Sequence, residues 1–172
     1  MMNSVIMPVH KIHPTAIVHP NAVIGKNVEI GAYAIVGDDV VIGDGCKLYP
    51  HAVIHEHTTV GKNCTFFPGC SIGAVPQDLK FAGEHSSTII GDGCIFRECT
   101  TVNRATGEGN KTIIGNNLLM MAYTHVAHNC IVGNNVIMSN VATLAGHVTL
   151  KTVLLSAVLL PCISSAKSAA AP

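Results

Sequence analysis

Three histidines and one glycine near the end of the chain have the types and spacing that acid–base chemistry requires. His125, His128 and His147 lie in the stretch MMAYTHVAHNCIVGNNVIMSNVATLAGH, where aliphatic or Met residues recur every six positions. Gly146 follows His128 by 18 residues, which is three repeats. If three repeats make one turn of a coil, Gly146 lies over His128 at one strand spacing, roughly 4.8 Å. A histidine base beside a bare backbone N–H suits acyl transfer.

The same repeat extends along most of the chain and predicts its fold. Aliphatic or aromatic residues occur at eleven consecutive six-residue steps from Ile12 to Ile72, and the register resumes at Ile90 and again from Ile114 to Leu150. An α-helix, with 3.6 residues per turn, would scatter these positions around its surface. Short flat strands joined by a bend at every repeat bring them into one interior. The spacing therefore predicts an all-β protein, a parallel β-helix.

Two smaller sets of residues accompany the aliphatic one. Gly often follows the aliphatic residue, with Asn or Asp two residues later, and we expect both at turns with positive φ. Small residues stand four positions after the aliphatic one, and five of the seven cysteines belong to this set: Cys46, Cys64, Cys70, Cys94 and Cys130. We expect these thiols to be buried, reduced and part of the core, with Cys46 stacked on Cys64. They show no C-x-x-C spacing, and we predict no metal site and no cofactor.

Composition limits the classes of function. The 172 residues include ten basic and ten acidic ones, which gives no reason to expect a nucleic-acid partner. The N-terminus lacks a basic region followed by a long apolar core, so we expect no signal peptide. The apolar run from Val153 to Ile163 is too short to span a bilayer and is interrupted by Ser156 and Pro161. The expectation is a soluble cytoplasmic protein.

Two segments leave the six-residue register, one near residues 74–88 and one near 103–112, with acidic residues where aliphatic ones are due. Both are predicted to be loops extruded from a regular stack, and loops on a rigid scaffold commonly carry binding residues. The first contains Gln77, Asp78 and Lys80 close together. These side chains favour a role in binding a sugar.

The regular pattern predicts one β-helix domain over residues 1–150. After Leu150 the turn residues stop, and Ser156 and Cys162 stand at the positions where aliphatic residues are due. Residues 151–172 are therefore expected to form an aberrant apolar tail, as a truncation or a shifted reading frame would produce.

The motifs VPQDLKFAGE, IFREC, TVNRAT, NNLLMMAYTHVAHNC and ATLAGHV together resemble the UDP-N-acetylglucosamine acyltransferases of lipid A synthesis, over roughly residues 10–150. The resemblance implies a left-handed β-helix and a homotrimer with active sites between subunits. It also implies that a 3-hydroxyacyl group passes from acyl carrier protein to the 3-hydroxyl of UDP-N-acetylglucosamine, in the first step of lipid A biosynthesis.

Site residues follow from matching these motifs one by one. His128 matches the family's general base, and Gly146 matches the residue whose N–H holds the oxyanion. The matching substrate-binding residues are His125 and His147 in the sugar and acyl pocket, Gln77, Asp78 and Lys80 around the sugar, and Asn103 and Arg104 in a further pocket segment.

The chain also departs from the family pattern. Asn129 follows His128 where the family has Asp, which leaves open what orients the imidazole, a backbone carbonyl being one candidate. Ala105 replaces the Gly of an NRGT-like motif. Later coils and a C-terminal helical domain have no counterpart, so the resemblance is to a C-terminally truncated member.

Three alternatives remain. A γ-class carbonic anhydrase would use His125, His128 and His147 as zinc ligands, although the H-x4-H spacing of that class is absent from this region. An inactive, truncated trimeric scaffold would keep the fold without the activity. The related N-acyltransferase acting on UDP-3-O-acyl-glucosamine matches the QDLK loop poorly.

Overall fold

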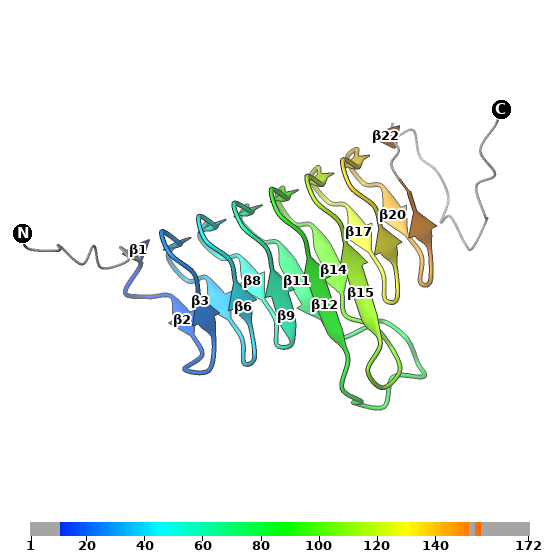
Figure 1. The fold of residues 1–172 in the computed structure, drawn as a ribbon, viewed down its shortest axis with the longest axis horizontal. Coiled ribbons are helices and arrows are strands. Elements are labelled where there is room, and N and C mark those ends of the chain that lie inside the picture. Colours follow the sequence, from blue (N-terminus) through cyan, green and yellow to red (C-terminus); the bar gives the residue numbers. More distant parts are fainter. Residues whose placement is uncertain (1–10, 152–153, 156–172) are drawn as a thin grey trace, which may run out of the picture.

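The computed structural model describes residues 11–151 and 154–155, which form 22 short strands and no helix. The strands assemble into three parallel sheets, and successive strands of the chain pass from one sheet to the next. This is a parallel β-helix with three flat sides, as the six-residue repeat predicts. Its coils follow one another along the long axis of the molecule (Figure 1).

Each sheet contains every third strand. The first comprises β1 (Lys11–Ile12), β4 (Glu29–Ile30), β7 (Lys47–Leu48), β10 (Thr65–Phe66), β13 (Ile95–Phe96), β16 (Leu119–Met120), β19 (Ile137–Met138) and β22 (Leu154–Leu155). The second comprises β2 (Ile17–Val18), β5 (Ile35–Val36), β8 (Val53–Ile54), β11 (Ser71–Ala74), β14 (Thr101–Asn103), β17 (His125–Val126) and β20 (Thr143–Leu144). The third comprises β3 (Val23–Ile24), β6 (Val41–Ile42), β9 (Thr58–Val60), β12 (Ser87–Ile90), β15 (Lys111–Ile114), β18 (Ile131–Val132) and β21 (Thr149–Leu150).

The repeated aliphatic residues stack in the interior because strands pair at one coil's spacing. Val36 pairs with Ile54, for example, and both side chains are fully buried. The interior also holds Phe66 and Phe96, whose rings stack with centroids 5.0 Å apart. Burying one such side chain contributes roughly 1.5–3 kcal/mol, so a column of them on every side stabilises the coil.

The cysteine prediction is confirmed for all five inward positions. Cys46, Cys64, Cys70, Cys94 and Cys130 are buried and free. The backbone N–H of Cys64 donates to Cys46 Sγ at 3.4 Å, which places the two residues in one column. Burial raises the pKa of Cys70 to about 12, so this thiol is unreactive at neutral pH. Cys99 is exposed, and Cys162 lies outside the described residues.

The prediction for the repeated glycines is wrong. Of the nine that follow an aliphatic residue, only Gly73 has a positive φ (83°), whereas Asn residues two positions later, such as Asn27 and Asn63, do adopt φ near +55°. The glycines are needed for a different reason. A Cβ on Gly43 would lie 2.6 Å from the carbonyl group of Gly61 in the next coil. They allow close approach between coils, while Asn makes the left-handed turn.

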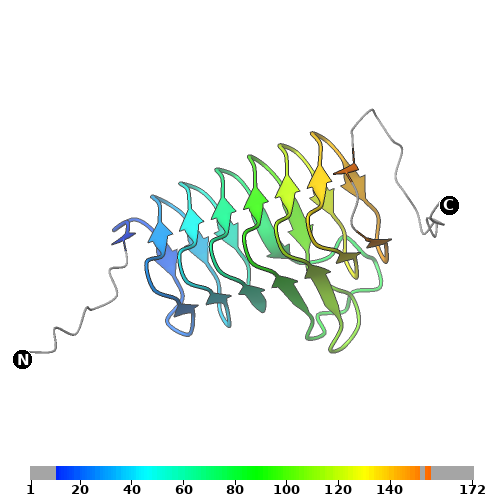
Figure 2. The same cartoon turned by 45° about the horizontal axis from the view of Figure 1, so that its top comes forward.

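Two insertions interrupt the stack in successive coils. Val60 pairs with Ile90, a separation of 30 residues, and Ile90 pairs with Ile114, a separation of 24, whereas regular coils are 18 residues apart. The extra residues lie between β11 and β12 and between β14 and β15, and both segments project from one edge of the coil (Figures 1 and 2). We call them the first loop (75–86) and the second loop (104–110).

Beyond Leu150 the structure describes little. Strand β22 adds to the first sheet by pairing with β19. The remainder of the tail predicted from residue 151 lies almost wholly outside the described residues. Nothing in the described part of the chain forms a helix of the length and apolarity that crossing a bilayer takes.

Candidate active site

His128 and Gly146 occupy equivalent corners of two successive coils. Strand β17 precedes His128, strand β20 precedes Gly146, and Val126 pairs with Leu144 in register. A Cβ added to Gly146 would lie 2.6 Å from both Cε1 and Nε2 of the His128 ring. Glycine therefore leaves room for the imidazole in the position that it occupies. No hydrogen bond links the Gly146 N–H to an acceptor in the described part of the chain.

Asn129 fixes the orientation and the tautomer of the His128 ring. The backbone N–H of Thr106 donates to Asn129 Oδ1 at 2.9 Å, and Asn129 Nδ2 donates to the Thr106 carbonyl at 3.0 Å. These two bonds identify the amide oxygen and the amide nitrogen. The oxygen lies 2.9 Å from His128 Nδ1, so Nδ1 carries a proton and, in the neutral ring, Nε2 keeps its lone pair.

The first loop brings a carboxylate to the same imidazole. Asp78 Oδ2 lies 3.9 Å from His128 Nε2, and both side chains are largely buried, at 18% and 15% exposed. The backbone N–H of Lys80 donates to Asp78 Oδ1 at 3.0 Å. This bond is the main reason that the pKa of Asp78 lies below its ordinary value, and the His128 ring adds to the shift. Asp78 is therefore a stable anion beside His128.

The other two histidines adjoin His128. The ring of His147 meets that of His128 edge to face, with centroids 5.2 Å apart, and the His147 N–H donates to the His128 carbonyl at 3.0 Å. His125 Nδ1 lies 2.7 Å from Thr101 Oγ1. Burial lowers the pKa of His125, and the nearby His128 adds to this effect. His147 thus contacts His128 directly, whereas His125 contacts Thr101 on the neighbouring strand.

Asn103 and Arg104 are buried and hold the two loops to the coil. Asn103 Nδ2 donates to the Val75 carbonyl at 3.1 Å, while its buried Oδ1 has no partner among the described residues. Arg104 Nη1 donates to Glu56 Oε1 at 2.7 Å, and its guanidinium lies 5.5 Å from the centre of the Phe81 ring. Arg104 is therefore already engaged by the protein.

The remaining predicted residues, Gln77 and Lys80, are exposed on the first loop. Of the three loop residues expected to act together, only Asp78 faces His128. Sequence reasoning did not include Thr106 or Glu56, which hold Asn129 and Arg104. No signal in the sequence marked them, because they contact partners 23 and 48 residues away across segments that break the repeat.

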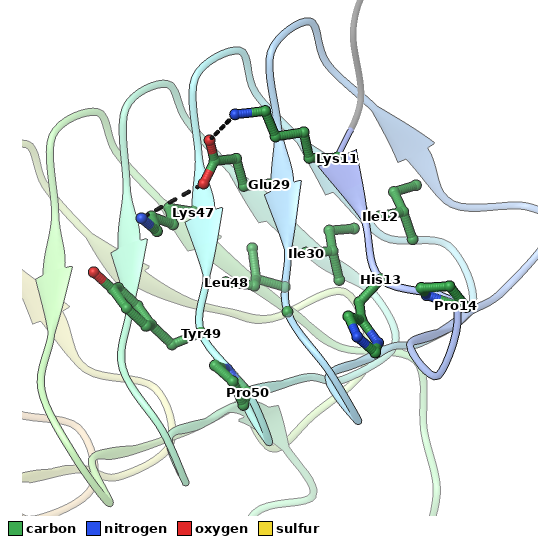
Figure 3. Close-up of a pocket in the computed structure, with 11 residues that line it drawn as sticks. Lys11, Ile12, His13, Pro14, Glu29, Ile30, Lys47, Leu48, Tyr49 and Pro50 are labelled. Carbon is green, nitrogen blue, oxygen red and sulfur yellow. Dashed lines mark hydrogen bonds and ion pairs between the residues drawn. The ribbon is translucent and has the colours of Figure 1, made fainter.

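A cavity of about 370 Å³ lies elsewhere, against the first sheet near its N-terminal end. It is lined by residues of β1, β4 and β7, and Glu29 bridges Lys11 and Lys47 at 3.3 and 3.5 Å across it (Figure 3). It contains none of the predicted site residues.

Histidines of the candidate site do not form a metal site. In residues 11–151, one group of three His, Cys or acidic side chains has donor atoms within 4.8 Å of one another, and it consists of Asp39, His57 and His85. His125, His128 and His147 are not such a group. The arrangement of these three side chains therefore does not favour a zinc site beside Gly146.

The chain is similar to known acyltransferases in sequence and in structure. The family described as bacterial transferase hexapeptide (six repeats) matches residues 21–56 and 39–73. The acyl-(acyl-carrier-protein)–UDP-N-acetylglucosamine O-acyltransferase of Stenotrophomonas maltophilia is 54% identical over 85 residues, which is 49% of this chain and 32% of that protein. The protein of the same name from Gloeothece citriformis is 50% identical over 86 residues, 50% of this chain and 31% of that one.

Solved structures extend the likeness to most of the described coil. LpxA from Acinetobacter baumannii superposes with a TM-score of 0.79 at 45% identity, over 80% of this chain and 54% of that one. UDP-N-acetylglucosamine acyltransferase from Campylobacter jejuni gives a TM-score of 0.77 at 41% identity, over 81% of this chain and 54% of that one.

The six-residue repeat, the fold and the similar solved structures together define a left-handed parallel β-helix of the hexapeptide-repeat class. Within that class, the chain is similar to proteins named as UDP-N-acetylglucosamine acyltransferases. It spans about half the length of these solved relatives, and its match covers about a third of the curated ones.

Proposed function

We propose that this chain is an acyltransferase. It moves a 3-hydroxyacyl group from acyl carrier protein to the 3-hydroxyl of UDP-N-acetylglucosamine, the first step of lipid A biosynthesis. The names of its relatives support this reaction. The observation that carries the proposal is the contact between His128 and Gly146, where the absence of a Cβ lets the imidazole approach the Gly146 backbone.

In the proposed mechanism His128 is the general base. Its Nε2 lone pair, kept free by the Asn129 contact, accepts the proton of the sugar hydroxyl as that oxygen attacks the thioester carbonyl. The Gly146 N–H donates to the oxyanion that forms. When the intermediate collapses, the C–S bond breaks and the departing thiolate takes the proton back from the imidazolium. The Asp78 carboxylate, 3.9 Å from Nε2, stabilises the charged ring in between.

The same proposal assigns the sugar to the space between the first loop and the His128 corner. Asp78 accepts from a sugar hydroxyl, Gln77 and Lys80 close over it from the loop, and His125 and His147 line its sides. Asn103, whose buried Oδ1 has no partner in the described part of the chain, and Arg104 complete the set by holding the loop in place. No metal or cofactor takes part in this mechanism.

We further propose that the protein is a cytoplasmic homotrimer, as the family resemblance implies. Exposed apolar side chains on the coil, such as Ile17 (63%), Val23 (60%) and Val141 (68%), are available for contacts between subunits. Light scattering should give about three times the 18.0 kDa mass of one chain. A monomer at all concentrations would refute the trimer.

A direct assay tests the activity. The chain is incubated with a 3-hydroxyacyl carrier protein and UDP-N-acetylglucosamine, and the acylated nucleotide sugar is measured. We expect transfer, with His128→Gln lowering turnover by about 10²- to 10⁴-fold, the usual contribution of a general base. An unchanged rate in His128→Gln would remove this residue from the mechanism. A folded chain with no transfer at all would favour the inactive scaffold instead.

A further inference from the structure

A second cluster of ligating side chains lies on the same edge of the β-helix as His128, but in earlier coils. Asp39 is in the turn between β5 and β6, His57 is 18 residues later in the turn between β8 and β9, and His85 is near the end of the first loop. His57 Nδ1 lies 3.0 Å from Asp39 Oδ2, and the His57 and His85 ring centroids are 4.5 Å apart. One donor atom from each residue lies within 4.8 Å of the other two.

The backbone of this cluster is fixed while its outer side chains are free to adjust. The His85 N–H donates to Glu108 Oε2 at 3.1 Å, and the His85 carbonyl accepts from the Gly109 N–H at 2.8 Å, so the second loop holds His85 from both sides. The His57 carbonyl accepts from the Thr88 N–H of the next coil at 3.1 Å. Asp39 and His85 are exposed, and their side chains can rotate without disturbing the core.

The donor set and spacing suit one kind of ion. Two imidazoles and a carboxylate are the ligands that Zn²⁺ takes in sites with an open fourth position, at about 2.0–2.2 Å. Ligand atoms of a tetrahedral ion then lie roughly 3.3 Å apart. The pair His57–Asp39 already has nearly this separation, and His85 needs to close the remaining gap of about 1.5 Å at most by side-chain rotation.

We infer that Asp39, His57 and His85 bind one zinc ion per chain. Water completes the tetrahedron on the open side. Because His85 belongs to the first loop and the other two ligands belong to the coil, the ion ties the base of that loop to the solenoid. The sequence predicts no metal site, because the insertion before His85 hides its position relative to the regular turns.

Chelator-treated protein provides the test, with cobalt and zinc as probes. Titration with Co²⁺ should produce the visible absorption of a tetrahedral ion at one equivalent per chain, and Zn²⁺ should abolish it. His57→Asn and His85→Ala should each lower zinc affinity by at least about tenfold, since even a partner of a metal ligand is worth about 10–100-fold. Asn is chosen at residue 57 because it tolerates the positive φ of 58° found there.

His51→Asn is the matched control, because His51 occupies the same place in the preceding turn, with φ 62°, and should leave zinc affinity unchanged. Circular dichroism verifies that each variant is folded. The inference is overturned if zinc does not bind in the low micromolar range, or if both cluster variants bind it as the wild type does. It is also overturned if His128→Gln removes the ion while His57→Asn does not, which would place zinc at the candidate active site. The titration does not depend on acyl transfer, so it can fail or succeed independently of the proposed activity.

Discussion

Asn129 Oδ1 lies 2.9 Å from His128 Nδ1, and the backbone of Thr106 fixes the amide from the opposite side. The amide oxygen uses one lone pair for the Thr106 N–H and the other for the imidazole. A neutral side chain therefore orients His128 where related enzymes are expected to use Asp. It sets the tautomer without adding a negative charge.

Replacing Asn129 with Gly tests this role of the amide. Gly accepts the φ of 58° at this position but removes every side-chain contact to His128 and Thr106. The imidazole then rotates and Nδ1 loses its partner, so we expect kcat to fall roughly 10- to 10²-fold, as misplacement of a reacting group does. The rate of acyl transfer measures this effect. The control is Asn135→Gly, at an equivalent turn (φ 56°) that does not contact His128. Equal rates in both variants would contradict an orienting role.

Gly146→Ala should separate catalysis from stability. Its Cβ would meet the end of the His128 side chain at 2.6 Å rather than backbone, so the ring can move aside at little cost in free energy of unfolding. That movement breaks the contact with Asn129, and we expect transfer to fall by roughly 10² or more. Gly133→Ala is the matched control, because its Cβ would meet backbone atoms only at 3.4 Å.

Both glycine variants should melt within a few degrees of the wild type. Only Gly146→Ala should lose activity. If Gly146→Ala transfers acyl groups at the wild-type rate, then close contact between the two coils is not needed for the reaction.

Period and spacing were sufficient to predict the coil, its inward columns and the stacking of Gly146 over His128. These relations follow from the number of residues between two positions, since every regular coil has the same length. The contacts that complete the site were not predictable, because Asp78 and Thr106 belong to the two loops, where the six-residue repeat is interrupted. The same reasoning misassigned the repeated glycines: a turn signal in the sequence does not distinguish left-handed φ from close backbone approach, as Gly43 illustrates.

The Glu56–Arg104 pair should contribute measurably to stability. The guanidinium is only 8% exposed and its carboxylate partner is 48% exposed, so solvent reduces the interaction without removing it. We expect Glu56→Gln to lower the free energy of unfolding by about 1 kcal/mol at pH 7, as judged by urea unfolding. Glu98→Gln, which affects an Arg97 pair exposed on both sides, should change the free energy of unfolding much less than Glu56→Gln does.

The pH dependence of the free energy of unfolding provides a second test of the Glu56–Arg104 pair. The hydrogen bond from Arg104 lowers the pKa of Glu56 in the folded protein. Its stabilisation is therefore complete above the unfolded value of about 4.3 and is lost as pH falls through the lowered folded pKa. The difference between wild type and Glu56→Gln should shrink at acid pH. A difference that stays constant down to pH 3 would show that the charge of Glu56 is unimportant.

His55 and His125 should make the fold sensitive to mild acid. Burial is the main cause that lowers the pKa of both residues, so the unfolded chain binds protons that the folded protein refuses. Stability should then fall as pH drops below the unfolded histidine value of about 6.5, by at most about 1.4 kcal/mol per pH unit for each residue. This pH range lies above the one in which the carboxylates titrate.

Urea unfolding from pH 8 to pH 5 measures the loss of stability in wild type and in His55→Gln/His125→Gln. We expect the two curves to run parallel above pH 7 and the variant to be flatter below it. Identical slopes between pH 6.5 and pH 5 would mean that neither histidine is held neutral by burial, and that acid destabilisation arises elsewhere in the coil.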